Sequence, residues 1–255
     1  MGAGHGHTLH YHGHSAIHRL PAHVKIVALV LFVLAVVATP REAFWPYAAH
    51  LTALVGAVLV SRVPLSYIGT RMVVEVPFVV FALLVPFVAI GPRVAVGPFE
   101  VSAPGLVAAW ALLAKGTLGV IASLLAAATT EARDLVAGFE RLRLPQPLVQ
   151  IMSFMLRYTE VVAGELSRMR IARDSRGFRA RSIRQWPVLG HTLGALFIRS
   201  YERGERVHLA MLSRGYAGRL PSLHPRTATS GEWAVGGILP GVAVLVCAAA
   251  LVIAR

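Results

Sequence analysis

Charged residues are scarce in this sequence. Asp, Glu, Lys and Arg make up 15% of the 255 residues, whereas a soluble domain usually has about a quarter. The single cysteine, Cys247, excludes a disulfide framework and a cysteine-ligated metal site. Apolar residues make up 56%, and the mean hydropathy is +0.64. This balance argues against a water-soluble globular fold and against a disordered chain, and it indicates an integral membrane protein.

Five apolar runs approach the length that a membrane-crossing helix needs, which is roughly 20 residues. The first run reaches back to Lys25, whose amine is expected to extend to the membrane interface. Between the runs lie short segments with proline or glycine, which break helices. The predicted fold class is therefore an all-α integral membrane protein with about five transmembrane helices. The runs span residues 26–38, 43–60, 72–90, 105–128 and 233–254.

The basic residues predict the orientation in the membrane. Of the 25 Lys and Arg residues, 17 lie between Thr129 and Gly231. With a cytoplasmic N-terminus, 21 of the 25 fall on the inside, as the positive-inside rule expects. The stretch 129–231 then forms a cytoplasmic insert between the fourth and fifth helices of a multi-pass protein of the cell membrane. Because the +13 charge lies beside membrane spans, we set nucleic-acid binding aside.

The expected organisation has four parts. A His-rich cytoplasmic tail covers residues 1–23, a four-helix membrane region covers 24–128, and a last membrane helix covers 232–255. The insert, 129–231, shows apolar residues at spacings of three and four, which predicts amphipathic helices. One helix opens at Pro145 and Pro147 and ends before Gly177, and a second opens at Trp186 and ends before Gly215.

These two helices end in the same way, 38 residues apart. Helix capping explains part of the match, because glycine ends helices in the left-handed conformation and arginine complements the helix dipole. Capping does not require serine before the arginine, or an aromatic residue after the glycine, in both places. The alternative is a pair of cationic tips that dock onto two copies of one partner. The matching residues are Ala172, Ser175, Arg176 and Gly177 in the first helix, and Ala210, Ser213, Arg214 and Gly215 in the second.

Histidines crowd the N-terminal tail, and imidazole suits Co²⁺, Ni²⁺ and Zn²⁺. The intervening glycines fix no geometry, so the alternative is a disordered tail that binds metal only adventitiously. The candidate ligands are His5, His7, His10, His12 and His14.

Two ionisable residues fall inside apolar runs, where charge is costly and usually functional. Lys115 lies near the middle of the fourth run, and Glu75 lies in the third. We expect Lys115 either to pair with Glu75 or to contact helices of a partner protein. The alternative is that Lys115 extends to an interface from a span with different boundaries.

Several motifs, in order, resemble the transmembrane T component of energy-coupling factor (ECF) transporters, specifically the cobalt-type CbiQ family. The resemblance covers nearly the whole chain. Pro21-Ala22-His23 departs from the Asp-Pro-Arg that family members often have, and the first 14 residues have no general counterpart. The motifs are Ser15-Ala16-Ile17-His18-Arg19-Leu20 with Lys25, Thr129-Thr130, Leu142-Arg143-Leu144-Pro145, Arg157-Tyr158 and the paired Ser-Arg-Gly endings.

The resemblance implies that the chain couples two cytoplasmic ATPase subunits, which bind ATP, to a membrane subunit that captures substrate. Arg176 and Arg214 would each contact one ATPase. The helices' apolar face would hold the capture subunit, with adaptable methionines able to re-pack. The chain has no phosphate-binding Gly-Lys-Ser/Thr loop, so we expect no ATP hydrolysis and no cofactor of its own, apart from Co or Ni at the tail. The methionines are Met152, Met155, Met169 and Met211.

The preferred interpretation is the energy-coupling subunit of a cobalt importer, because the His-rich tail favours a metal cargo. The same role in nickel or vitamin uptake is one alternative. A membrane-embedded enzyme is another, with Lys115, Glu75 and His50 forming a buried polar site.

Overall fold

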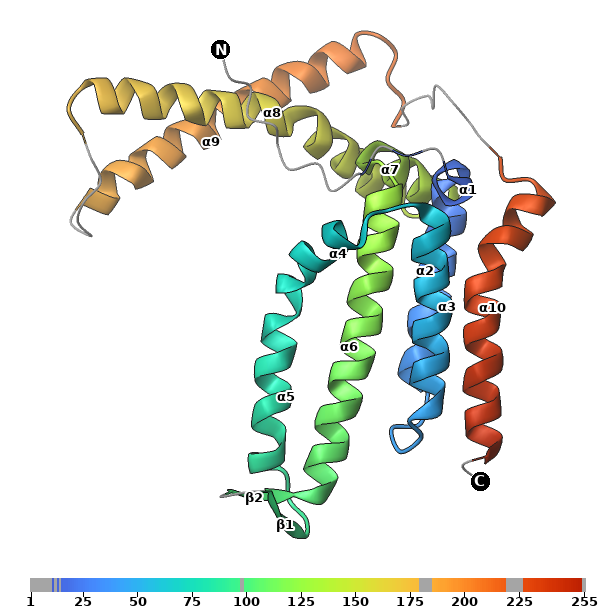
Figure 1. Cartoon of the computed structure of the whole chain (residues 1–255). Helices are drawn as coiled ribbons and strands as arrows, with labels where there is room; N and C mark the ends of the chain where they lie inside the picture. The colour runs from blue at the N-terminus through green and yellow to red at the C-terminus, as the bar shows by residue number, and fades with distance from the viewer. Residues whose placement is uncertain are drawn as a thin grey trace. The chain divides into compact units, whose positions relative to one another are not determined.

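The computed structural model describes residues 11, 13, 15–96, 99–178, 185–218 and 227–253. The chain divides into two compact units, one formed by residues 1–138 with 226–255 and the other by residues 139–225. Most of the described residues in both units are helical, as Figure 1 shows. The all-α membrane class predicted from the sequence is confirmed.

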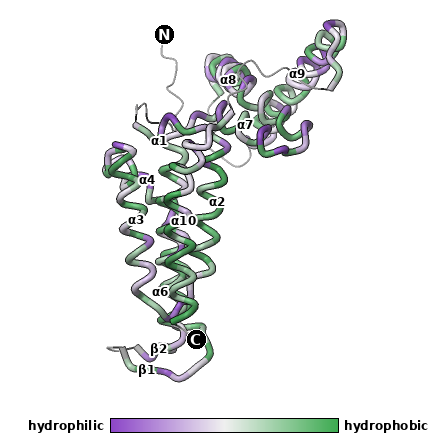
Figure 2. Tube along the Cα trace, turned by 90° about the vertical axis from the view of Figure 1, so that its right-hand side faces the viewer, coloured by the Kyte–Doolittle hydropathy of each residue, from purple (hydrophilic) through white to green (hydrophobic). Residues whose placement is uncertain are grey.

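The first unit holds most of the apolar helices. Three stretches, 65–88, 103–129 and 230–253, are long and apolar enough to cross a membrane. Two shorter apolar helices have 17 residues each, so the number of spans stays a prediction. In Figure 2 these helices are hydrophobic along most of their length. The elements are α1 (Ala16–Arg19), α2 (Ala22–Ala38), α3 (Trp45–Ser61), α4 (Leu65–Arg71), η1 (Met72–Glu75), α5 (Val76–Val88), α6 (Ala103–Thr129), α10 (Ser230–Ile253) and most of α7 (Ala132–Arg141), whose last three residues belong to the second unit.

The third apolar segment begins earlier than expected. Helix α4 starts at Leu65, directly after Pro64, and continues through η1 into α5. The sequence pattern placed this start at Met72, with Arg71 in the preceding loop. The structure corrects that boundary: Arg71 is helical, and its guanidinium lies 3.6 Å from the ring centroid of Tyr67, one turn earlier.

A small hairpin joins α5 to α6, and no pattern in the sequence predicted it. Strands β1 (Arg93–Val96) and β2 (Phe99–Ser102) pair antiparallel, with Val94 opposite Val101. Ser102 ends the hairpin and caps α6, since its hydroxyl accepts a hydrogen bond from the Gly105 amide at 3.4 Å. The hairpin therefore sets where the longest helix of this unit begins.

The core of the first unit lies between α2, α3, α6 and α10. Its largest buried side chains include Phe32, Leu54 and Val58, and Leu118 and Leu125 face them from α6. Thr39 at the end of α2 is also buried: its hydroxyl donates to the Ala35 carbonyl at 2.8 Å and lies 3.1 Å from Nε2 of His50. The polar groups at this helix end are thus bonded inside the bundle.

Two lysines fix α2 against α6. Lys25, near the start of α2, donates to the Thr129 carbonyl at the end of α6 (2.6 Å). Lys115, in the middle of α6, donates to the Val37 carbonyl at the end of α2 (2.7 Å). The last carbonyls of a helix have no partner within it, and they carry the negative end of the dipole. Each helix is therefore capped by a lysine of the other, and the two run antiparallel.

These contacts correct one expectation and add detail to another. The Lys25 side chain is 8% exposed and its amine is bound to helix ends, while its position relative to a membrane interface stays a prediction. Lys115 and Glu75 do not pair. Glu75 instead accepts a hydrogen bond from the Thr117 hydroxyl.

The second unit contains α8 (Gln146–Ser175) and α9 (Trp186–Leu212). Side-chain hydrogen bonds show how they run. Gln150 bonds to Tyr216 just beyond the end of α9, Glu165 to Arg199, and Arg173 to Thr192. As the residue number rises on one side, it falls on the other, so the helices run antiparallel. Figure 2 shows many hydrophilic positions along both helices, as the sequence predicted.

Glu165 provides the charged link between α8 and α9. One carboxylate oxygen lies 2.7 Å from Arg168 of the same helix, and the other lies 2.6 Å from Arg199 of α9. Hydrogen bonds from Arg168 and then Arg199 hold the pKa of Glu165 below its ordinary value of 4.5. Because the pKa is lowered in the folded state, this stabilisation is present at neutral pH and is lost as the pH falls through the folded-state pKa.

The close approach of α10 to α2 gives the first prediction. A Cβ on Gly236 would overlap Cγ1 of Val24, and Val24 is buried. Gly236→Ala should therefore destabilise the unit by about 1–3 kcal/mol and lower its melting temperature in detergent. Gly237→Ala is the matched control, because nothing lies within 4 Å of its Cβ position. Alanine also has the higher helix propensity. Equal melting temperatures for both variants would contradict the packing described here.

The ion pair of Glu165 gives the second prediction. Glu165→Gln should lower the melting temperature of the purified protein at neutral pH. Because the folded-state pKa of Glu165 lies below its ordinary value, the difference from the unaltered chain should shrink as the pH falls through that pKa. Glu160→Gln, at an exposed α8 position, should show no such pH-dependent difference. A Glu165→Gln difference that persists unchanged in acid would show that the carboxylate charge does not stabilise the α8–α9 pair.

Candidate functional site

The ends of α8 and α9 have the same backbone geometry. Gly177 and Gly215 take positive φ values of 78° and 80°, which glycine adopts without strain. In each ending the glycine donates to the carbonyl three residues earlier, and the following aromatic residue donates to the carbonyl five residues earlier. This is the Schellman arrangement. The pairs are Gly177–Asp174 (3.0 Å) and Phe178–Arg173 (3.3 Å), then Gly215–Leu212 (3.0 Å) and Tyr216–Met211 (3.0 Å).

The serine and alanine of each ending also form one local contact. Ser175 donates its hydroxyl to the Ala172 carbonyl, and Ser213 donates to the Ala210 carbonyl, both at 3.0 Å. These bonds satisfy one further carbonyl in the last turn, where partners are lacking. Helix termination thus accounts for the serine, the glycine and the backbone amide of the aromatic residue at both ends.

Arg176 and Arg214 are the part of the motif that termination leaves unexplained. Both side chains are exposed, and neither guanidinium forms a hydrogen bond or an ion pair with the residues that the structure describes. Arg168, Arg170 and Arg199, on the same helices, each have a carboxylate partner. The structure therefore presents two similar helix ends. At each, the N–H groups of one planar guanidinium can donate hydrogen bonds to a partner.

The two endings differ in the aromatic residue after the glycine. Phe178 lies under the guanidinium of Arg173, 5.4 Å from the ring centroid. Tyr216 instead donates its hydroxyl to Oε1 of Gln150 near the start of α8 (2.5 Å), and Nε2 of Gln150 donates to the Gly218 carbonyl (2.5 Å). The second ending is therefore tied to the first helix by a side chain that no sequence pattern predicted. A lone glutamine carries no pattern, and its partners lie 66 and 68 residues away.

A groove between α8 and α9 presents apolar surface. Ile151, Met155 and Val162 line it from α8, and Gly204 lines it from α9. Met155 is 63% exposed, whereas Met152, Met169 and Met211 are half-buried. Of the four methionines named as adaptable, only Met155 is thus clearly offered on the surface of the pair.

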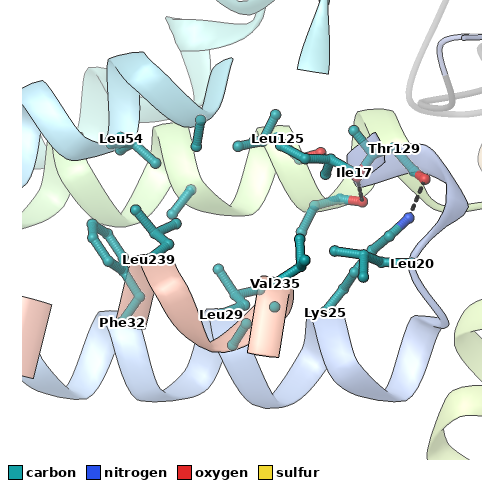
Figure 3. Close-up of a pocket in the computed structure, with 15 residues that line it drawn as sticks. Ile17, Leu20, Lys25, Leu29, Phe32, Leu54, Leu125, Thr129, Val235 and Leu239 are labelled. Atoms are coloured by element: carbon teal, nitrogen blue, oxygen red, sulfur yellow. Dashed lines mark hydrogen bonds between the residues drawn. The ribbon is translucent and has the colours of Figure 1, made fainter. Parts of the chain in front are cut away.

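The first unit brings together the N-terminal motif residues and Thr129-Thr130. Ser15 caps α1, and its hydroxyl lies 2.7 Å from Nδ1 of His18. Lys25 contacts the His18 carbonyl (3.3 Å), the Thr129 carbonyl (2.6 Å) and the Thr130 hydroxyl (3.3 Å). Figure 3 shows Lys25 pointing to Thr129 at one end of an apolar cavity lined by Leu29, Phe32, Leu125, Val235 and Leu239.

The other candidate residues are not gathered into a site. Lys115, Glu75 and His50 have three different partners, Val37, Thr117 and Thr39, and among the described residues no hydrogen bond or ion pair joins the three. His5, His7, His10, His12 and His14 lie outside the described residues. Within the described part of the chain, no three His, Cys, Asp or Glu residues are placed to hold a metal ion.

Comparison with known proteins gives relatives of two kinds. An uncharacterized protein of Methanocaldococcus jannaschii is 34% identical over 105 residues, which are 41% of this chain and 39% of that one. A second uncharacterized protein of that organism is 30% identical over 97 residues, which are 38% of this chain and 33% of that one. The chain thus matches well under half the length of these two relatives.

Two relatives with descriptive names add to this. The energy-coupling factor transporter transmembrane protein EcfT of Bacillus selenitireducens is 30% identical over 220 residues, or 81% of each chain. The cobalt transport protein CbiQ of Rhodobacter capsulatus is 30% identical over 104 residues, or 41% of this chain and 43% of that one. The family model described as CbiQ, cobalt transport protein, matches residues 13–224, a range that includes both helix endings. The chain therefore belongs to the CbiQ family of transporter membrane components.

Proposed function

We propose that this chain is the energy-coupling membrane subunit of an ECF-type cobalt importer, and that Arg176 and Arg214 each dock into one of two cytoplasmic ATPase subunits. The observation that carries the proposal is the pair of matching helix ends, whose exposed guanidinium groups have no partner among the described residues. Two equal tips on one chain suit two copies of one partner. Family membership and the similarity to EcfT support the coupling role.

Arginine suits such a contact for geometric reasons. Its guanidinium can donate two parallel hydrogen bonds to a carboxylate, and it can also donate to backbone carbonyls. Ser175, Gly177, Ser213 and Gly215 beside the tips are small, and the Ser hydroxyls are turned back onto their own helices. A partner surface can therefore approach each arginine closely.

The apolar groove beside Ile151 and Met155 supports a second contact, with a membrane subunit that captures the substrate. Apolar side chains that face outward on an amphipathic pair usually mark an interaction surface. ATP binding would then move the two ATPases, and the ends of α8 and α9 that carry Arg176 and Arg214 would move with them. This movement of α8 and α9 would reorient the capture subunit. Substrate choice belongs to that subunit, so nickel or a vitamin remains the alternative cargo.

The proposed orientation has the N-terminus and the α8–α9 unit in the cytoplasm and the protein in the cell membrane. The support is the bias of Lys and Arg, with 17 of 25 in residues 129–231. The antiparallel α2 and α6, held by Lys25 and Lys115, fit this orientation because they cross in opposite directions. An intrinsic enzyme activity is less favoured, since Lys115, Glu75 and His50 are bound to separate partners.

Charge reversal at the tips tests the docking. Arg176→Glu or Arg214→Glu keeps the glycine stop and the Schellman bonds, so the helices should still end correctly. Losing a charge-assisted hydrogen bond removes about 1.5–3 kcal/mol, so each single change should weaken ATPase binding by roughly one to two orders of magnitude. The double variant should lose both ATPase co-purification and ATP-driven cobalt uptake, with membrane insertion unchanged.

Arg170→Glu and Arg206→Glu are the matched controls, because these arginines are exposed on the same two helices but away from the tips. Arg170 has only an exposed ion pair at 3.8 Å, which contributes little. Both controls should keep ATPase binding. Normal co-purification and uptake by the double variant would show that the two endings only terminate helices.

The His-rich tail is tested by a deletion. The deletion should stop at His10, because the amide of Tyr11 donates to the Ala128 carbonyl at the end of α6 (2.8 Å). Without residues 2–10, assembly with the ATPases should be intact, and uptake should fall only at low external Co²⁺. Changing the five histidines to glutamine in the full-length chain should have the same effect. Loss of the assembled complex in either variant would assign the tail a structural role instead.

A further inference from the structure

Three chain segments meet at the C-terminal end of α6. The Lys25 ammonium lies inside the unit and donates to the Thr129 carbonyl (2.6 Å), the Thr130 hydroxyl (3.3 Å) and the His18 carbonyl (3.3 Å). Its partners thus come from the last residue of α6, from the residue after it and from the end of α1. Figure 3 shows the ammonium reaching Thr129 across the edge of an apolar cavity.

The N-terminal segment adds further bonds to the same point. The Tyr11 amide donates to the Ala128 carbonyl (2.8 Å), and Nε2 of His18 lies 3.0 Å from the Tyr11 carbonyl. Nδ1 of the same ring lies 2.7 Å from the Ser15 hydroxyl. The carbonyls of Ala128 and Thr129, which α6 leaves without helical partners, are therefore both bonded from outside the helix.

This point is also where the helical ladder is interrupted. Thr130 is extended, with φ −135° and ψ 127°, and α7 starts two residues later at Ala132. Helix α7 itself lies against the start of α2. A Cβ on Gly138 would be 3.0 Å from the His23 amide nitrogen and 3.1 Å from the Ala22 side chain. The first turns of α2 therefore hold both sides of the α6–α7 connection.

The chain continues from α7 into α8, so a pull on α8 reaches α6 along the chain through Thr130, whereas α9 continues toward α10. An extended two-residue connection would bend under such a pull if nothing bound it. Hydrogen bonds from an ammonium in apolar surroundings are strong, because little water competes for them.

We propose that Lys25 is a positioning residue that stiffens the α6–α7 connection, so that displacement of α8 and α9 moves α6 and the helices packed on it instead of bending the chain at Thr130. This inference rests on the proposed coupling function. It predicts that without Lys25 the ATPases still bind and hydrolyse ATP, but less of that hydrolysis drives uptake.

The test uses the whole complex, with the ATPase pair and the capture subunit, in lipid vesicles. The measured quantity is labelled cobalt taken up per ATP hydrolysed. Once hydrolysis by unassembled ATPases is subtracted, this ratio does not depend on how much of the complex is folded, so a general loss of stability leaves it unchanged. Lys25→Met keeps the apolar stem and removes the donors, and it should lower the ratio about tenfold. Lys25→Arg keeps a cation and should restore most of it.

Lys115→Met is the matched control. It removes the same kind of lysine–carbonyl bond from the same pair of helices, but at the Val37 end, away from α7. Its ratio should equal that of the unaltered chain. Thr130→Val removes only one acceptor and should lower the ratio about threefold, with no further effect when combined with Lys25→Met.

An unchanged ratio in Lys25→Met overturns the inference, and so does an equal loss in Lys115→Met. If the complex with Lys25→Met does not assemble, the Thr130→Val variant provides the test. An unchanged uptake ratio in Thr130→Val would then overturn the inference. Failure of the coupling function itself looks different: the unaltered chain would not bind the ATPases, or charge reversal at Arg176 and Arg214 would leave binding intact.

Discussion

The arrangement of the first unit depends on two ammonium groups bound to the ends of neighbouring helices. A lysine among apolar helices is costly unless its donors are used, and the last carbonyls of a helix are costly unless something donates to them. The bonds from Lys25 to Thr129 and from Lys115 to Val37 use the lysine donors and also satisfy the helix-end carbonyls. The two bonds also fix the relative height of α2 and α6, because sliding one helix along the other by a single turn would break both.

The second unit separates the requirements of folding from those of binding within one short motif. Serine, glycine and the following amide close the last turn in both helices, and their bonds match closely in partner and length. The Arg176 and Arg214 side chains, by contrast, form no hydrogen bond or ion pair with the described residues. A sequence repeat alone does not reveal this division, since capping and docking favour the same residue types.

Local patterns allowed much of the fold to be predicted. Breaker residues and spacing placed the ends of α8 and α9, because glycine and proline act through the backbone beside them. What the sequence could not provide were partners distant along the chain. The acceptors of Lys25 and Lys115 are backbone carbonyls, which every residue has, so no side chain marks them. Gln150 likewise has partners far along the chain that no sequence pattern marks. The start at Leu65 was missed because Arg71 resembled a loop residue, although its guanidinium lies on Tyr67.

Helices α2 and α3 have 17 residues each, about 25 Å, whereas the 27 residues of α6 extend about 40 Å. For the two short helices to cross a bilayer with a hydrocarbon core about 30 Å thick, the lipid beside them must thin, while α6 must tilt or extend beyond it. The Lys115–Val37 bond holds the end of α2 at the middle of α6, so this mismatch cannot relax by sliding. If α2 and α3 cross the membrane, the lipid on their side would be thinner than the lipid beside α6, which would favour neighbours with short membrane helices there.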